Sequence, residues 1–460
     1  MSTLRVRMYR QGLGDCFLLT CKADGQADWH GLIDCGVFTG TANAQARMQE
    51  VAENVSTVTG GRLDVLVATH EHWDHLSGFL QARDVFDPFT VKEVWLAWTE
   101  DSKDELANEL RTRKTRALRA VDTAARRLTV SGDEAAKGMA SRLEGLLQFH
   151  GELGAAATQT TGAALEWVKG RPDATVRCLR PGEQLAPEGL TGVRVYVLGP
   201  PHDRTWIRRS DPSKRHSEVY ELPGEASAEV GFYAAVDALE AEPQAELQPF
   251  EERFRIGEEE ARQDAFFAQR YDHPANAWRR VEYDWLGVAG RLALRLDQDT
   301  NNTSLALAFE LGDGGPVLLF PGDAQVGNWL SWEPLKWQVE AAGGMRTVTT
   351  PDLLARTALY KVGHHGSHNA TLGEKGLELM KRNDLVAMIP VDRGMAKRKG
   401  WKMPFQPLLD RLKEKTAGRI LDAEQGIAAE NPGRLSDEEW ASFRARTRQE
   451  DGWLDYVIEW

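Results

Sequence analysis

The sequence has few cysteines, no long apolar run and a shortage of positive charge. Its 460 residues include four cysteines, Cys16, Cys21, Cys35 and Cys178. They show neither C-x-x-C spacing nor the density of a disulfide framework, so we expect buried thiols in a reducing compartment. No segment approaches the roughly 18 apolar residues of a transmembrane helix, and residues 1–8 lack the apolar core of a signal peptide. The sequence therefore predicts a cytoplasmic protein without a membrane partner.

The charge balance is acidic, with 56 Lys and Arg against 69 Asp and Glu and a net charge of −13. This balance argues against broad, non-specific nucleic-acid binding through counterion release, although it leaves room for a local basic lining around a site. One compact basic cluster contains Arg393, Lys397, Arg398, Lys399 and Lys402. Charge runs of this kind are usually solvated loops, and the alternative is a contact for a substrate phosphate.

The length permits one large domain with insertions or two to three ordinary domains. Short apolar strands alternate with helical patterns in residues 1–98, 193–202 and 300–460, which indicates an α/β protein with a mixed sheet. Two stretches with a different composition and periodicity interrupt this pattern. Residues 99–192 are mainly helical in their periodicity, and residues 203–299 are charged and irregular. We expect a single domain over 1–460 with these two stretches as insertions.

The strongest local signal is an H-x-H-x-D-H motif directly after an apolar run at residues 63–68. That run is short and β-branched enough to be a buried strand. Residues two apart at a strand end point to one side, so His70 and His72 can bind one cation together. Asp74 and His75 follow at the start of a predicted helix and can reach a second cation.

The alternative is that these side chains are buried for packing alone. Three histidines and an aspartate within six residues are hard to bury in that way, because each ring and carboxylate would need its own partner. A site that keeps the pattern but has lost its metal is a second alternative. The motif is interpreted as a metal site.

Two later strand ends carry further candidate ligands. Residues 317–320 form an apolar strand that ends in Gly-Asp, and Asp323 is well placed there to bridge two cations. A second strand runs into His364 and His365. Adjacent histidines cannot easily face one metal, so one should bind the cation and the other contact the substrate or leaving group. We assign the first role to His364 and the second to His365.

Asp34 lies near the end of an early predicted strand, in the sequence Asp-Cys-Gly. Its role can be interpreted in two ways. Aspartate near glycine is most often an ordinary turn residue. The alternative is a carboxylate that orients one histidine of the motif by accepting its second N–H.

Taken together, the H-x-H-x-D-H, Gly-Asp and His-His-Gly-Ser signals resemble those of the metallo-β-lactamase superfamily. More narrowly, several segments resemble the hydrolase domain of the ComEC/Rec2 competence proteins, namely residues 12–16, 32–36, 69–75, 301–304, 320–323 and 364–367. The resemblance implies an αββα sandwich with a dinuclear metal site along one edge. The membrane domains of the competence proteins have no counterpart here, so DNA uptake is not implied.

The resemblance also implies a ligand set. His70 and His72 would bind the first metal, Asp74 and His75 the second, Asp323 would bridge, and His364 would complete the second site. Many superfamily members have a further histidine at the first metal, and no such motif is clear in this sequence. The best candidate is His202, which follows a predicted strand and could equally be an ordinary loop histidine.

This chemistry predicts a dinuclear metal-dependent hydrolase. Two divalent ions, zinc or manganese, would generate a bridging hydroxide, with Asp74 orienting it and His365 assisting the leaving group. The resemblance favours a phosphodiesterase or nuclease acting on nucleic acid or a small phosphoester. One alternative is a hydrolase of a small ester, lactone or nucleotide. Another is a partner-binding or sensing subunit that uses its insertions to contact a protein and keeps the hydrolase fold as a scaffold.

Overall fold

Two eight-stranded mixed β-sheets form most of the first of two structural units. The computed structural model describes residues 2–22, 25, 27–129, 134–151, 158–209, 256–271, 273, 275–276, 287–341 and 344–460. The first unit comprises residues 1–111, 148–212 and 297–460, and the second comprises 112–147 and 213–296. In the predicted second insertion, residues 210–255 and 277–286 lie outside the described part of the chain.

The first sheet is antiparallel on one side and parallel on the other. In spatial order its strands are β17 (Thr447–Glu450), β18 (Trp453–Glu459), β1 (Thr3–Tyr9), β2 (Cys16–Lys22), β3 (Trp29–Cys35), β4 (Arg62–Ala68), β5 (Thr90–Ala97) and β6 (Thr175–Leu179). The pairs from β17 to β3 are antiparallel, and β3, β4, β5 and β6 run parallel. β4 is almost fully buried, which accounts for the apolar run Val65 to Ala68 at its end.

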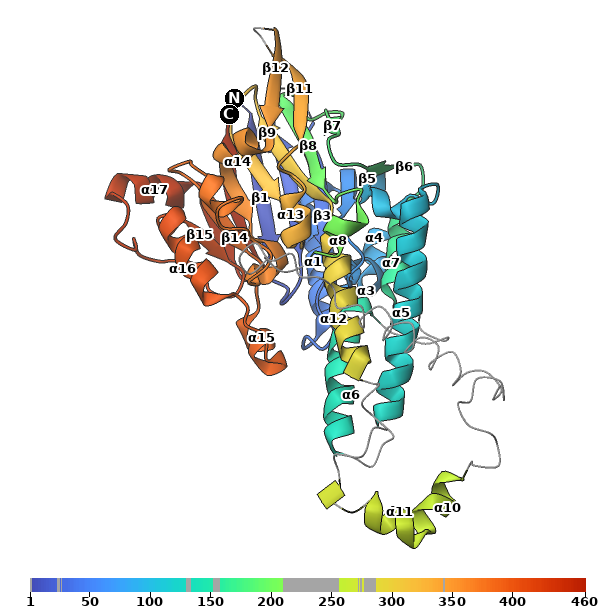
Figure 1. The fold of residues 1–460 in the computed structure, drawn as a ribbon. Helices are drawn as coiled ribbons and strands as arrows, with labels where there is room; N and C mark the ends of the chain where they lie inside the picture. Colours follow the sequence, from blue (N-terminus) through green and yellow to red (C-terminus); the bar gives the residue numbers. More distant parts are fainter. Residues whose placement is uncertain are drawn as a thin grey trace. The chain divides into compact units, whose positions relative to one another are not determined.

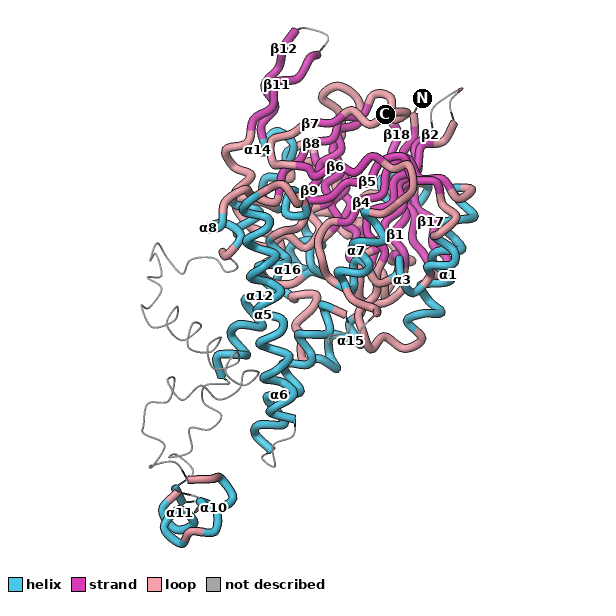
Figure 2. The backbone as a smooth tube through the Cα atoms, turned by 90° about the vertical axis from the view of Figure 1, so that its right-hand side faces the viewer, coloured by secondary structure: helices cyan, strands magenta, loops and turns pink. Residues whose placement is uncertain are grey.

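The second sheet has the same mixed character. In spatial order its strands are β16 (Gly426–Ile427), β15 (Ile420–Asp422), β14 (Val386–Ile389), β13 (Thr357–Lys361), β10 (Val317–Phe320), β9 (Ala306–Leu311), β8 (Val193–Gly199) and β7 (Gln184–Leu185). The neighbours β10, β13, β14 and β15 are parallel, and the outer pairs are antiparallel. A separate hairpin of β11 (Lys336–Ala341) and β12 (Gly344–Thr349) projects beyond the sheets (Figures 1 and 2).

The two sheets pack face to face over a shared apolar core. Val6 and Val67 of the first sheet belong to one buried cluster with Phe309 and Leu359 of the second. Helices cover the two outer faces (Figure 1), α1 (Ala44–Thr59), α3 (Gly78–Gln81) and α7 (Thr161–Lys169) over the first sheet and α16 (Gln406–Lys415) over the second. The arrangement is compatible with an αββα sandwich that can bind metal.

Shorter helices connect these layers. They are α2 (Trp73–Leu76), α4 (Arg83–Phe86), α8 (Arg204–Ile207), α13 (Val326–Leu330), α14 (Thr350–Ala355), α15 (Arg393–Lys399), α17 (Asp437–Ala445) and the 3₁₀ turns η1 (Trp98–Glu100), η2 (Gln148–His150), η7 (Gly363–Gly366) and η8 (Leu377–Leu379). The basic cluster, interpreted above as a loop, therefore includes a helix, α15, that Asp392 caps through a hydrogen bond to the amide of Met395.

The second unit is helical where it is described. It contains α6 (Glu134–Leu147), α10 (Glu258–Gln263), α11 (Ala265–Arg270) and most of α5 (Glu105–Thr129) and α12 (Gly287–Asn302). Among the helices that the structure describes, none combines the length and apolar composition that crossing a membrane requires.

The predicted α/β class with mixed sheets is confirmed. The expected strands at 63–68 and 317–320 are β4 and β10. Residues 175–185, which the sequence analysis assigned to the first insertion, contribute β6 and β7 to the two sheets. Both strands lie at sheet edges and are short or partly exposed, so their apolar pattern is weak.

A buried carboxylate, Glu310 on β9, is surrounded by hydrogen-bond donors. It accepts from the Tyr196 hydroxyl at 2.5 Å, from Arg356 Nη1 at 2.7 Å, from Arg346 Nη2 at 3.1 Å and from the amide of Gly314 at 2.9 Å. Burial alone would raise the pKa of Glu310, but the bonds from Tyr196 and Arg356 outweigh it and lower the pKa below its ordinary 4.5. The charged form of Glu310 therefore stabilises this part of the second sheet.

Replacing Glu310 by glutamine should lower the free energy of unfolding by about 3 kcal/mol at pH 7, because it leaves arginines without their buried partner. A lowered native pKa gives stability that is complete above the unfolded pKa and is lost as pH falls through the native value. The difference between wild type and variant in urea unfolding should thus shrink below pH 4.5. The exposed Glu340→Gln variant is the control and should unfold like wild type both at pH 7 and below pH 4.5.

Candidate metal centre

Four buried ligand-type side chains converge where parallel strands of both sheets end. Asp74 and His75 follow β4 in the first sheet, and Asp323 and His365 follow the neighbouring strands β10 and β13 in the second. Parallel neighbours end at the same edge of a sheet, which brings residues distant in sequence together. One ligand atom from each of the four lies within 4.8 Å of the others. A second group, Asp15, Asp34 and His75, shares a histidine with the first, so the two groups could hold one or two metal ions.

Asp34 fixes the ring of His75. Its Oδ2 lies 2.8 Å from His75 Nδ1 and also accepts from the Thr69 hydroxyl at 2.6 Å, while its Oδ1 accepts from the Thr69 amide at 2.8 Å. The hydrogen on Nδ1 is therefore directed at Asp34, and Nε2 faces Asp323 Oδ2 at 3.1 Å. A histidine whose second nitrogen is bound to a carboxylate in this way is typical of metal sites.

His365 is held in the same manner by a backbone carbonyl. Its Nδ1 lies 2.6 Å from the oxygen of Pro390, which can only accept, so Nδ1 carries the hydrogen. Nε2 then faces Asp74 Oδ2 at 3.1 Å. The backbone of His365 is left-handed, with φ of 52°. Such a conformation is unfavourable for a residue with a Cβ and concentrates at functional sites.

The structure brings His365, and not its neighbour His364, into the four-residue group. His364 is also left-handed, with φ of 42°, and its Nδ1 lies 3.0 Å from the Ser367 hydroxyl. Its backbone amide donates to Asp323 Oδ1 at 3.0 Å. Two successive left-handed residues set the rings 6.0 Å apart between centroids. The two adjacent histidines therefore have separate surroundings, and the ring that joins the group is His365, which the sequence analysis expected to contact the substrate.

Lys361 contributes a buried positive charge to the centre. Its ammonium group donates to Asp15 Oδ2, to Asp323 Oδ1 at 3.1 Å and to the carbonyl of Gly322 at 2.8 Å. These three bonds use all three ammonium hydrogens. Asp323 consequently has one oxygen bound to Lys361 and the other directed at His75. The sequence analysis gave no role to Lys361 or Asp15, because a lysine in an apolar strand carries no motif.

The charged side chains of the centre shift one another's pKa values. Burial alone would lower the pKa of His75, but Asp323, Asp15 and Asp34 outweigh it and raise the pKa well above 6.5. Burial alone would likewise raise the pKa of Asp323, whereas His75 and Lys361 lower it well below 3.8. The carboxylate of Asp323 is thus held in its charged form, which is the form that binds a cation.

His70 and His72 lie beside this group. His70 Nε2 is 3.1 Å from His72 Nδ1, and the rings of His70 and His75 are 4.2 Å apart between centroids. Two residues without a sequence signal approach His72: its Nε2 is 3.7 Å from Asp297 Oδ1, and its ring is 5.1 Å from that of His150. No local pattern marks either residue, because each reaches the centre from a segment distant in sequence.

His202, the candidate for a further metal ligand, is not part of this centre. Its Nε2 is 2.8 Å from Asp104 Oδ2, its ring packs against Trp98 at 4.2 Å, and its side chain is 40% exposed. It belongs to neither of the two groups of ligand atoms.

The donor set fits a divalent cation. Asp74 Oδ1 and Asp15 Oδ1 are buried and have no hydrogen-bond donor among the described residues. A buried carboxylate oxygen without a donor is costly unless a cation compensates it. Imidazole and carboxylate ligands without thiolate suit zinc and also accommodate manganese. The chain therefore has a buried His/Asp centre that can hold metal.

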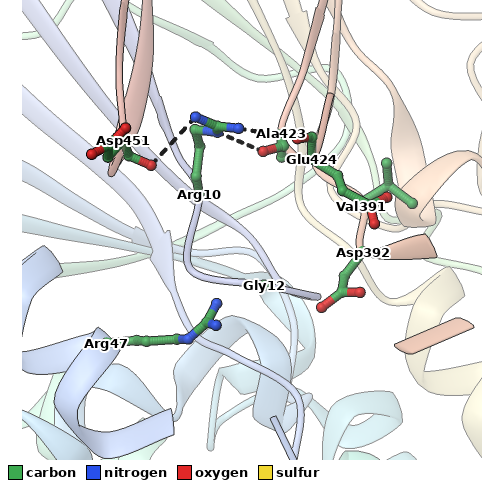
Figure 3. A pocket seen from close by; sticks show the side chains of 8 residues that line it. All are labelled: Arg10, Gly12, Arg47, Val391, Asp392, Ala423, Glu424 and Asp451. Carbon is green, nitrogen blue, oxygen red and sulfur yellow. Dashed lines mark hydrogen bonds between the residues drawn. The ribbon is translucent and has the colours of Figure 1, made fainter. Parts of the chain in front are cut away.

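A separate pocket of about 220 Å³ is lined by Arg10, Gly12, Arg47, Val391, Asp392, Ala423, Glu424 and Asp451 (Figure 3). Arg10 donates to the carbonyls of Ala423 at 2.7 Å and Glu424 at 3.0 Å. The pocket contains no histidine and none of the residues of the metal centre, so its lining offers no comparable ligand set.

Comparison with known proteins adds no assignment. No known protein family matches the sequence, and no curated protein matches it. The functional argument therefore depends on the centre itself.

Proposed function

We propose that this chain is a metal-dependent hydrolase of phosphodiester bonds, built on a metallo-β-lactamase-like sandwich. The observation that carries the proposal is the pair of histidines, His75 and His365, whose Nδ1 atoms are bound to acceptors while their Nε2 atoms face carboxylates. Asp74, His75, Asp323 and His365 would hold the cation. A bound divalent ion lowers the pKa of a water and stabilises the charge that develops on a phosphoryl oxygen.

The surrounding residues have distinct parts in this proposal. Asp34 and the Pro390 carbonyl orient the two imidazoles, so each directs its Nε2 toward the position of the cation. Lys361 fixes one oxygen of Asp323, which restricts that carboxylate to coordination through the other. His364, at 7% exposure, and Ser367 remain for contact with the substrate or the leaving group. This exchanges the roles that the sequence suggested for the two adjacent histidines.

A buried aromatic cluster with one lysine at its edge lies beside His72. Phe149 lies 5.6 Å from the ring of His72 and 5.3 Å from that of Trp401. Lys399 donates to Gln148 at 2.6 Å and lies 5.4 Å from the ring of Phe38. Phe38 and Phe149 are 0% and 5% exposed, so these rings offer no face for base stacking, and the preference for a nucleic-acid phosphodiester rests on the family resemblance alone.

A hydrolase of a small ester or nucleotide is the second candidate. The specific observation in its favour is burial: Asp74, His75, Asp323 and His365 are each at most 1% exposed. A small substrate reaches such a centre more easily than a duplex, and the net charge of −13 opposes extended contact with a polyanion.

The test is cleavage of labelled single- and double-stranded DNA and RNA, and of a small phosphodiester, by protein loaded with zinc or manganese. We expect metal-dependent cleavage that disappears on chelation. The Asp74→Asn variant, purified in the same way, controls for contaminating nuclease. Cleavage of the small phosphodiester alone would support the second candidate, and a metal-loaded protein that cleaves none of these substrates would refute the phosphodiesterase proposal.

A further inference from the structure

The pocket in Figure 3 is formed by segments of the first unit that are distant in sequence, and Arg10 holds several of them together. Its Nε donates to the carbonyl of Ala423 at 2.7 Å, and its Nη2 donates to that of Glu424 at 3.0 Å. Its Nη1 donates to the carbonyls of Glu450 at 3.2 Å and Asp451 at 3.4 Å. These bonds use four of the five N–H groups of the guanidinium, so Arg10 shapes the wall of the pocket and has little left to offer a ligand.

Gly12 keeps the space in front of Asp392 open. Its φ of 122° lies in the region that favours glycine. A Cβ at this position would lie 3.1 Å from Thr41 Cγ2 and 3.7 Å from Asp392 Oδ2. Any other side chain here would therefore be strained and would crowd the Asp392 carboxylate.

Two opposite charges face this space without forming an ion pair. Arg47, on α1, donates from Nη1 to the carbonyl of Gln11 at 3.2 Å. Asp392 Oδ1 accepts from the amide of Met395 at 2.7 Å. Figure 3 shows the guanidinium of Arg47 and the carboxylate of Asp392 pointing into the pocket from two sides. In the described part of the chain neither side chain forms an ion pair, so four N–H groups of Arg47 and Oδ2 of Asp392 are available to a ligand.

We propose that this pocket binds a small zwitterion with one carboxylate and one ammonium group, of the class of the free amino acids. Arg47 binds the carboxylate through two parallel N–H groups, and Asp392 Oδ2 accepts from the ammonium group. A ligand with a single charge leaves one of these two groups without a partner. The volume of about 220 Å³ agrees with a ligand of this size, because sites for drug-sized ligands have roughly 300–1,000 Å³.

Two segments that line the pocket continue into the metal centre. Asp15, three residues after Gly12, belongs to the second group of ligand atoms. Val391 directly follows Pro390, whose carbonyl oxygen lies 2.6 Å from His365 Nδ1. A zwitterion that fixes these segments changes the affinity of the centre for metal, and the metal changes the affinity for the zwitterion by the same factor. This effector role rests on the proposed function, whereas the binding site itself does not.

The binding test uses the full chain and measures its Tm. The probes are the free L-amino acids, together with propionate and ethylamine, each of which keeps one of the two charged groups of alanine. At least one amino acid should raise the Tm, whereas propionate and ethylamine should not. The amino acid that raises the Tm most is then titrated by calorimetry, and Arg47→Gln and Asp392→Asn should each weaken its binding by at least roughly tenfold.

Both variants should fold. Arg47 is exposed, and asparagine caps a helix as well as aspartate does, so Asp392→Asn keeps the bond to the Met395 amide. Arg83→Gln, which removes an exposed arginine of α4 that pairs with Asp87, is the matched control and should bind like wild type. If no amino acid binds, or if both pocket variants bind as tightly as wild type, the site is overturned. Equal binding of propionate would show a simple anion site and overturn the zwitterion assignment.

Zinc titration of the metal-free protein, with and without the bound amino acid, tests the connection to the metal centre. The zinc affinity should change by roughly fivefold or more. Unchanged zinc affinity would overturn the effector role. A protein that binds the amino acid but no zinc would overturn the proposed function and leave the pocket assignment intact.

Discussion

Replacing Asp323 by asparagine should lower the rate of metal-dependent hydrolysis by about 1,000-fold, as measured by kcat/KM on the substrate that the wild type cleaves. Metal contributes several kcal/mol of transition-state stabilisation, and each 1.36 kcal/mol corresponds to a factor of ten. Asp323 supplies the carboxylate between Lys361 and His75, with distances of 3.1 Å to each. An amide in its place cannot neutralise a cation, so metal affinity should fall together with the rate.

The chain offers a matched control for this substitution. Asp313 also follows a glycine after a strand of the second sheet, but its side chain is 41% exposed and pairs with Arg194 and Arg346 at the surface. Asp313→Asn should change neither metal binding nor rate by more than a small factor. Equal losses in Asp323→Asn and Asp313→Asn would show that the effect of the first does not come from the metal centre.

Replacing Lys361 by methionine should destabilise the metal-free protein by about 4 kcal/mol, measured by urea unfolding. Removing one member of a buried ion pair leaves an uncompensated charge, which costs far more than the net value of the pair. Lys361 is 1% exposed and is bound to Asp15 and Asp323, which are equally buried. Methionine fills a similar volume without the charge. The lost stability therefore measures mainly the cost of leaving the carboxylates of Asp15 and Asp323 buried without a counter-charge.

Two further variants show whether the charge causes this loss. Lys361→Met combined with Asp15→Asn removes one uncompensated carboxylate and should recover part of the stability lost in the single variant. Lys375→Met deletes an exposed lysine that pairs with Glu333 at 2.6 Å, and surface pairs contribute about 0–1 kcal/mol. If the double variant is no more stable than Lys361→Met alone, the packing of the lysine stem, and not its charge, stabilises this region.

The local sequence predicted the strands that end at the buried His/Asp centre and marked several of the side chains that the structure gathers there, namely Asp74, His75, Asp323 and His365. The apolar run that ends β4, Val65 to Ala68, indicates a buried strand, because a strand covered on both faces lacks polar alternation. The spacing in H-x-H-x-D-H predicts ligands after that strand, because residues two apart at a strand end share a face. Asp323 and the histidine pair were found by the same reasoning at β10 and β13.

The backbone decides which of the adjacent residues His364 and His365 directs its ring toward the centre. Both residues are left-handed, and this conformation turns only His365 toward Asp74 and the Pro390 carbonyl. The two residues have identical side chains and adjoining positions, so composition and spacing carry no information on which ring faces the centre. Non-glycine residues adopt the left-handed region only where surrounding contacts enforce it.

The tertiary structure alone brought in the residues that come from far along the chain. His365 and Asp74 are 291 positions apart yet meet at 3.1 Å, because β4 and β13 end at the same side of two packed sheets. Lys361 appears in sequence as one polar residue in an apolar strand, and its role depends on Asp15 lying opposite. His150 and Asp297 have no motif at all. Sequence periodicity determines which elements form and which faces they bury, whereas contacts between distant elements depend on how the sheets pack, and these contacts complete the centre.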